Sequence, residues 1–155
     1  EYRLPTEAEW EHAARGGTTE ARFWDKLEGM ACEFANLAGQ NSCSDGYEEG
    51  APVGSYRANA FGLYDMLGNV AEWVEDCWHE SYDRAPTDGR ARTRAPDMAN
   101  GGSADAYSVG DCNQKVYRGG DWHSALHEAR SASRAGMSKE AKSKYIGLRI
   151  VRALP

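Results

Sequence analysis

The stretch at residues 61–73, FGLYDMLGNVAEW, is the part of the sequence around which the rest of the chain is organised. Two carboxylates, Asp65 and Glu72, flank a Leu-Gly-Asn turn at residues 67–69, and the apolar residues around them predict that the stretch is largely buried. Carboxylate oxygens together with the backbone carbonyls of a turn are how proteins hold a hard cation such as calcium. A buried carboxylate needs either a cation or several hydrogen bonds, so capping of backbone amides is the alternative.

Composition limits the classes of protein to which the chain can belong. The 155 residues suffice for one domain with a real core, and 17 glycines with five tryptophans and eight tyrosines predict a loop-rich fold anchored by aromatic side chains. The net charge of −6 argues against nucleic acid as a partner, because nucleic-acid binding needs a basic face. No apolar run approaches the length of a membrane span, so no span is expected.

The four cysteines allow three disulfide pairings. We favour Cys32 with Cys43 and Cys77 with Cys112, because each pair would close a loop rich in turn-forming residues. These bonds would favour an extracytoplasmic or secreted protein. The alternative is four unpaired thiols in a cytosolic protein, and the absence of a C-x-x-C motif argues against a zinc site.

Local signals predict one helix and several short strands. Thr6 and Glu9 form the sequence pattern of a capping box, and the two glycines at 16–17 end the helix that follows. Apolar patterning and turn residues predict strands at residues 52–56, 70–78, 116–122, 130–134 and 146–151.

Five motifs follow one another along the chain: RLPTEAEWEHAARGG at 3–17, APVGSYRANAFGLYDMLGNVAEWVEDCW at 51–78, VYRGGDWHS at 116–124, RSASR at 130–134 and IGLRIVR at 146–152. In this order they resemble the formylglycine-generating enzyme family, also called the sulfatase-modifying factor family. The resemblance implies an α+β, C-type-lectin-like fold with little regular secondary structure, many loops and structural calcium. It also implies that residues 1–155 are a single domain lacking the N-terminal portion usual in the family.

The resemblance implies two sets of calcium ligands. The second set contains the carboxylates of the opening stretch, so the resemblance and the chemistry of the residues agree there. The first set is Asn36, Leu37 (carbonyl), Asp45 and Tyr47 (carbonyl), and the second is Asp65, Gly68 (carbonyl), Val70 (carbonyl) and Glu72.

The catalytic residues of the family do not carry over to this chain. The family's enzymes oxidise a substrate cysteine with two copper-binding cysteines, and the aligned positions here hold Ser124 and Ala129. No thiol follows Cys112, so a soft Cu(I) site and a thiol for exchange with substrate are both missing. Copper and formylglycine-generating activity are therefore not expected.

The segment between Trp122 and Ile146 resembles Asn-rich segments of related bacterial domains, which in turn resemble the variable templates of diversity-generating retroelements. This resemblance implies a ligand-binding surface whose residues are substituted; ordinary divergence of a surface loop is the alternative. The ligand-binding residues would be Trp122, His123, Ser124, Ala125, His127, Ser133, Ala135, Met137, Lys144 and Tyr145.

The sequence thus predicts a non-catalytic binding module for a protein or glycan ligand, and it gives no indication of the oligomeric state. One alternative is an enzyme of the same superfamily, either of the formylglycine-generating type or a non-haem iron oxidoreductase, whose catalytic groups lie partly outside this chain. In that alternative Arg130 and Arg134 would orient an anionic substrate. An accessory domain of a signalling protein is a third alternative.

Overall fold

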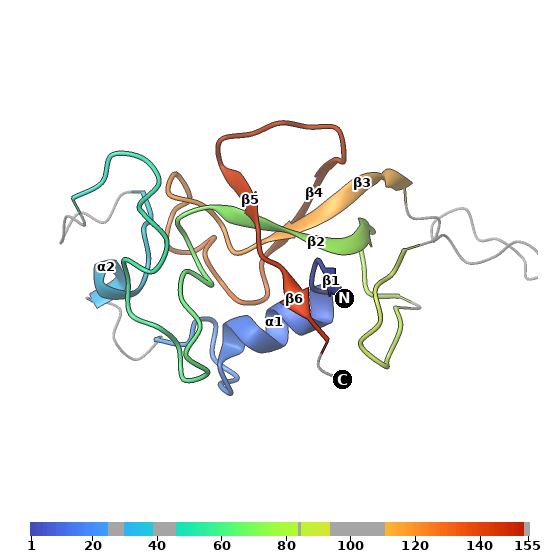
Figure 1. Ribbon diagram of the computed structural model, residues 1–155, viewed down its shortest axis with the longest axis horizontal. Helices are drawn as coiled ribbons and strands as arrows, with labels where there is room; N and C mark the ends of the chain where they lie inside the picture. Colours follow the sequence, from blue (N-terminus) through green and yellow to red (C-terminus); the bar gives the residue numbers. More distant parts are fainter. Residues whose placement is uncertain (25–29, 39–45, 84, 94–110, 154–155) are drawn as a thin grey trace, which may run out of the picture.

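The computed structural model describes residues 1–24, 30–38, 46–83, 85–93 and 111–153, and Figure 1 shows their arrangement. Short elements are joined by long loops, as the resemblance implies. In chain order the elements are β1 (Tyr2–Arg3), α1 (Glu7–Arg15), α2 (Ala31–Phe34), β2 (Ala71–Trp78), β3 (Asp111–Arg118), β4 (Arg134–Ser138), β5 (Ile146–Leu148) and β6 (Val151–Arg152).

Helix α1 begins and ends where the sequence predicts. The Glu9 amide donates to the Thr6 hydroxyl at 3.1 Å, and the Thr6 amide donates to the Glu9 carboxylate at 2.9 Å, which completes the capping box. Gly16 ends the helix in the left-handed conformation with φ of 55°. The buried face of α1 carries Trp10 and Ala14.

A four-stranded sheet in the order β4-β3-β2-β5 forms the centre of the molecule (Figure 1). Strands β2 and β3 are antiparallel, with Glu72 opposite Arg118, whereas β5 runs parallel to β2. A separate antiparallel pair, β1 with β6, brings the two ends of the chain together (Figure 1). Because α1 lies across the sheet, its buried face and the sheet enclose the core.

The core contains residues from the first three motifs, at 3–17, 51–78 and 116–124. Trp10 of α1 packs with Met66 and Leu67 of the opening stretch and with Val74 of β2, and each of these is at most 1% exposed. Burial of the opening stretch is therefore confirmed at Met66 and Leu67, but it is wrong for Phe61 and Tyr64, which are each 48% exposed. A second aromatic layer extends the core, in which the rings of Trp24 and Phe34 stack with centroids 5.6 Å apart.

Of the five predicted strands, the one at 70–78 is confirmed as β2, and the other four differ from the structure. Residues 52–56 form turns, with Gly54 at φ of 77°. Strand β3 ends at Arg118 because Gly119 and Gly120 adopt φ of 99° and 71°, which break the ladder. The segment 130–134 is mostly turn, and 146–151 divides into β5 and β6.

Two of the four cysteines lie among residues whose side chains the structure describes. Cys32 and Cys77 are both in disulfides. Their predicted partners, Cys43 and Cys112, lie outside the described side chains, so the pairing stays a prediction. Within the described ranges, no helix has the length and apolar character that crossing a membrane would require.

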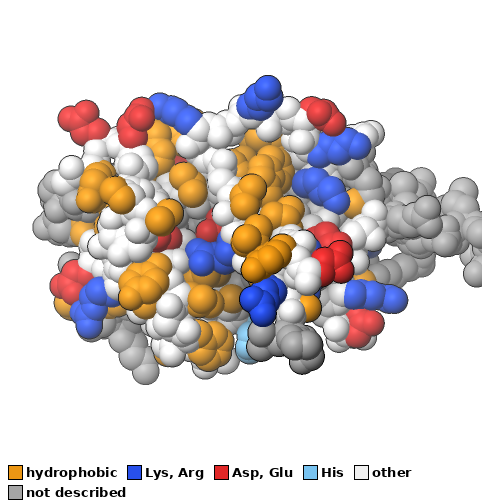
Figure 2. All heavy atoms as spheres, in the orientation of Figure 1, with side chains coloured by type: hydrophobic (Ala, Val, Ile, Leu, Met, Phe, Trp, Pro, Cys, Tyr) orange, Lys and Arg blue, Asp and Glu red, His pale blue; other side chains and the backbone are white. Residues whose placement is uncertain are grey.

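The strands β5 and β6 carry exposed apolar side chains. Figure 2 shows hydrophobic side chains gathered down the middle of the face on which Figure 1 places these strands. Leu148 and Ile150 are 64% and 58% exposed, and Tyr2 of β1 is 64% exposed. Arg149, between these two exposed residues, points the other way and binds Glu72. The apolar side chains of this segment therefore face solvent, and its charged side chain faces the protein.

Candidate ligand-binding site

The opening stretch holds both ends of the predicted ligand-binding segment. The Trp122 amide donates to the Asn69 carbonyl at 2.8 Å, and the Ala71 amide donates to the Tyr145 carbonyl at 2.8 Å. Asn69 and Ala71 lie at the end of the buried turn and the start of β2. The turn therefore fixes where the segment between Trp122 and Tyr145 leaves the scaffold and where it returns.

The conformation of this turn depends on its sequence. Gly68 has φ of 76° and Asn69 has φ of 61°, a region that glycine and asparagine tolerate best. The Asn69 amide donates to the Asn36 carbonyl at 2.8 Å, and a Cβ atom at Gly68 would lie 2.5 Å from that same oxygen. The Asn69 side chain pairs with both backbone groups of Ala51. These bonds hold the turn against two other segments of the chain, at Asn36 and at Ala51.

One group of the predicted ligand-binding residues forms an aromatic cluster: Trp122, His123, Lys144 and Tyr145. The ring centroids of Trp122 and Tyr145 are 5.0 Å apart, and His123 lies about equally close to both rings, at 5.9 and 6.0 Å. The Lys144 ammonium lies 5.0 Å from the Trp122 ring and 2.6 Å from the Glu49 carboxylate. This combination offers rigid aromatic surface with a charged edge.

A second group lines a cavity of about 470 Å³, here called the polar cavity, between the end of β3 and the start of β4. Its predicted members are Ser124, His127, Ser133 and Ala135. Two predicted residues join neither group. The Ala125 amide donates to the Glu128 carboxylate, and Met137 lies in β4 opposite Lys115.

The two positions that hold copper-binding cysteines in the family's enzymes have other roles here. The Ser124 hydroxyl accepts a hydrogen bond from the Asp121 amide at 3.1 Å. Ala129 is completely buried in the core. A methyl group and a hydrogen-bonded hydroxyl supply no soft ligand for copper.

The two carboxylates of the second predicted calcium set, Asp65 and Glu72, differ in their hydrogen-bond partners. Both oxygens of Glu72 accept hydrogen bonds, from Arg149 at 2.9 and 3.0 Å and from the Trp10 indole at 2.7 Å. One oxygen of Asp65 accepts from the Gly54 amide, and the other is buried with no partner in the described part of the chain. The Asp65 oxygen suits a cation, whereas the charge of Glu72 is already compensated by the Arg149 guanidinium. Calcium at this set, with the carbonyls of Gly68 and Val70, stays a prediction.

The first predicted calcium set is described only in part. Asn36 and Leu37 are buried, and the Asn36 amide nitrogen donates to the Glu49 carbonyl at 2.8 Å. Tyr47 is exposed, and Asp45 lies outside the described residues. Across the described ranges, no cluster of three or more His, Cys, Asp or Glu side chains is arranged to hold a metal ion.

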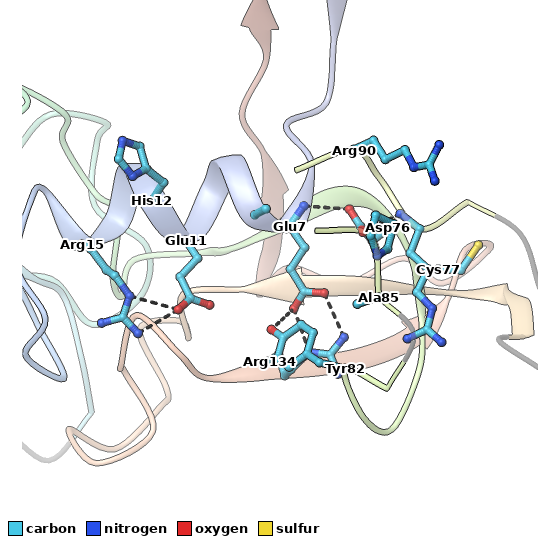
Figure 3. A pocket seen from close by; sticks show the side chains of 13 residues that line it. Glu7, Glu11, His12, Arg15, Asp76, Cys77, Tyr82, Ala85, Arg90 and Arg134 are labelled. Atoms are coloured by element: carbon cyan, nitrogen blue, oxygen red, sulfur yellow. Dashed lines mark hydrogen bonds and ion pairs between the residues drawn. The ribbon is translucent and has the colours of Figure 1, made fainter. Parts of the chain in front are cut away.

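A second cavity, also of about 470 Å³, opens beside the first turn of α1, and Figure 3 shows its lining. The Glu7 carboxylate accepts hydrogen bonds from Arg134 at 2.7 and 2.9 Å and from the Tyr82 hydroxyl at 3.0 Å, while its amide donates to Asp76 (Figure 3). Loss of hydration and the Glu7 charge raise the pKa of Tyr82 to about 12, so the phenol stays a donor.

The guanidinium of Arg118 completes this buried ion cluster. It is 1% exposed, binds Glu7 at 3.2 Å and Glu11, and donates to the carbonyls of Ser131 and Ser133. Sequence reasoning missed the cluster. Glu7 is visible in the sequence only as an acid in the first helical turn, and Arg118 only as part of a strand followed by glycines.

Arg134 belongs to the lining of both cavities. Its guanidinium lies 4.7 Å from the Trp78 ring and 4.5 Å from the Tyr82 ring, and it is bound to Glu7. Arg134 is therefore committed to the scaffold. Arg130, in contrast, is exposed and lines the polar cavity, and its guanidinium has no partner in the described part of the chain. Of the two arginines proposed to orient a substrate, only Arg130 is free to do so.

The domain is a C-type-lectin-like scaffold whose central turn holds a surface segment in place. That segment lacks the cysteine pair of the family's oxidising enzymes. The chain belongs to the sulfatase-modifying factor family: residues 1–154 match the sulfatase-modifying factor enzyme 1-like domain. It is 34% identical over 157 residues to the formylglycine-generating enzyme of Streptomyces coelicolor, covering 95% of this chain and 45% of that protein.

Two solved structures show the same fold. PvdO from Pseudomonas aeruginosa superposes with a TM-score of 0.78 at 37% identity, over 96% of this chain and 51% of that one. Treponema denticola variable protein 1 superposes with a TM-score of 0.73 at 28% identity, over 96% of this chain and 46% of that one. The chain thus spans about half the length of these relatives.

Proposed function

We propose that this domain is a non-catalytic binding module that presents the surface between Trp122 and Ile146 to a protein or glycan ligand. The observation that carries the proposal is that this segment forms an aromatic cluster and a polar cavity and lacks the two cysteines that the family's enzymes use. The positions of those cysteines hold Ser124 and the buried Ala129 here. Rigid aromatic side chains such as Trp122 and Tyr145 provide large contact area at low entropic cost.

The likeness to a variable protein supports a finer version of the same proposal. In this version a diversity-generating retroelement rewrites exposed positions of the segment, while Asn69 and Ala71 hold its two ends through backbone atoms only. Backbone anchoring tolerates any side chain at the substituted positions. Sequencing this locus in several isolates tests the idea, which fails if changes between residues 122 and 146 are no denser than elsewhere.

We further propose that structural calcium binds at the first set, Asn36, Leu37, Asp45 and Tyr47. The support is the buried Asn36 amide, whose nitrogen is held by the Glu49 carbonyl, so that its oxygen is the atom available to an ion. Asparagine, carboxylate and carbonyl oxygens are the ligands that calcium prefers.

Metal analysis with an oxidation assay separates the binding module from an enzyme. We expect the purified protein to contain calcium but neither copper nor iron, and to melt at a lower temperature after chelation, because a ligand of the folded state stabilises it. We also expect no oxygen uptake when Cu(I) and a cysteine-containing peptide are supplied. Tightly bound copper or iron, or oxygen uptake with the peptide, would contradict the non-catalytic proposal, and an unchanged melting temperature would contradict structural calcium.

A further inference from the structure

The polar cavity exposes hydrogen-bond acceptors whose positions are fixed by the backbone. Asp121 accepts from the His123 amide at 2.7 Å, and Glu128 accepts from the Ala125 amide at 2.8 Å. Each carboxylate uses one oxygen for this bond, and its other oxygen has no partner among the described residues. Both residues line the cavity. The cavity therefore offers two oriented acceptors that cost little conformational entropy to use.

Donors lie beside these acceptors. Arg130 has an uncommitted guanidinium, and the Nε atom of the buried Arg118 is without a hydrogen-bond partner in the described part of the chain. The hydroxyls of Tyr117 and Ser133 also line the cavity. Burial, with a smaller contribution from the Asp121 charge, raises the pKa of Tyr117, which keeps its phenol protonated as a donor. The accessible donors of the cavity are therefore the Arg130 guanidinium and these hydroxyl-bearing side chains.

The mixture of signs restricts the chemistry of the ligand. A purely anionic ligand would be repelled by the carboxylates of Asp121 and Glu128, and a purely cationic ligand would be repelled by the guanidinium of Arg130. A polyhydroxylated ligand satisfies both kinds of group, because every hydroxyl both donates and accepts a hydrogen bond. A volume of about 470 Å³ lies in the range of small-molecule sites and exceeds what a single ion needs.

We propose that the polar cavity binds a neutral sugar residue through Asp121, Glu128 and Arg130. The inference rests on the proposed binding function and names the chemistry of its ligand. The two carboxylates accept from sugar hydroxyls, and the exposed Arg130 guanidinium donates to them. The aromatic cluster then contacts whatever the sugar is attached to.

Calorimetry or saturation-transfer NMR with the methyl glycosides of glucose, galactose and mannose tests this proposal, with sulfate as the anionic probe. We expect at least one glycoside to bind at concentrations up to about 10 mM, a weak affinity usual for one small polar ligand. Asp121→Asn retains the acceptor for the His123 amide and replaces the other oxygen with a donor. Asp121→Asn and Arg130→Gln should each weaken binding about tenfold or more.

The matched control is Arg90→Gln, which removes an exposed arginine from the other cavity and should leave glycoside binding unchanged. Absence of glycoside binding, binding of sulfate alone, or equal loss in the Arg90→Gln protein would overturn the proposal. If the protein binds a peptide through Trp122 and Tyr145 but binds no glycoside, the sugar proposal is refuted, whereas the proposed binding function is not.

Discussion

Replacing Glu7 with alanine is expected to lower the free energy of unfolding by about 3–5 kcal/mol, the usual cost of removing one partner from a buried ion pair. Glu7 is 5% exposed and is the shared acceptor for Arg118, Arg134 and the Tyr82 hydroxyl. Among the described residues, Arg118 would keep only Glu11 as an ion-pair partner, and Arg134 would lose the one carboxylate with which it pairs. Urea unfolding followed by tryptophan fluorescence measures the change.

The control is Glu33→Ala, which removes the exposed ion pair with Arg57. The side chains of that pair are 46% and 63% exposed, so the loss should stay within about 1 kcal/mol. A cost for Glu7→Ala no larger than that for Glu33→Ala would show that the cluster does not stabilise the fold.

Gly68→Ala is expected to cost about 3 kcal/mol or more, for two reasons that add. An alanine at φ of 76° carries a conformational penalty of roughly 1–2 kcal/mol. Its Cβ atom would lie 2.5 Å from the Asn36 carbonyl oxygen, and forcing such groups apart costs roughly 1–3 kcal/mol. Thermal and urea unfolding measure the sum.

Gly62→Ala is a matched control for the conformational part. Gly62 has nearly the same φ, 74°, but a Cβ atom there would have nothing within 4 Å. Its substitution should cost about 1–2 kcal/mol. If the two alanine variants lose the same free energy of unfolding, the close approach between Gly68 and the Asn36 carbonyl has no energetic cost on substitution, contrary to our description of the turn. A larger loss at Gly68 should also loosen the segment between Trp122 and Tyr145.

The parts of the fold that could be predicted are those in which a local signal and the tertiary structure agree. Thr6 with Glu9 specifies a helix start from four consecutive residues, and the capping box forms as predicted. The buried turn at 67–69 was visible because Gly and Asn stand among apolar residues. The family resemblance added the overall architecture, which composition alone leaves open.

The features that could not be predicted depend on partners far apart in the sequence. Glu7 meets Arg134 across 127 positions and Arg118 across 111. Arg149 meets Glu72 across 77 positions, which is why the carboxylate read from sequence as a calcium ligand is found against a guanidinium. The sequence at 130–134 has the alternating pattern of a strand. In the structure, however, the Arg118 guanidinium donates hydrogen bonds to the carbonyls of Ser131 and Ser133 and holds this part of the chain in a turn.

The same reason explains the candidate site. Its chain segment could be chosen from sequence, because it lies between two scaffold motifs and lacks the cysteines of the enzymes. The division of its residues into an aromatic cluster and a polar cavity could not be predicted, since only the path of the loop brings Ser124 and Ser133 to the lining of the same cavity. Nor could the sequence tell that Arg130 is free and Arg134 bound.

The measurement that tests the central claim most directly is binding of the labelled protein to arrays of glycans and peptides, compared with the double variant Trp122→Ala, Tyr145→Ala. We expect a discrete set of bound ligands whose affinity falls about 30-fold or more in the double variant, as for loss of central aromatic contacts. Tyr64→Ala, which removes a 48% exposed aromatic side chain outside the segment, should bind as the parent does. Equal binding by the parent and the double variant, or no bound ligand on either array, would contradict the account.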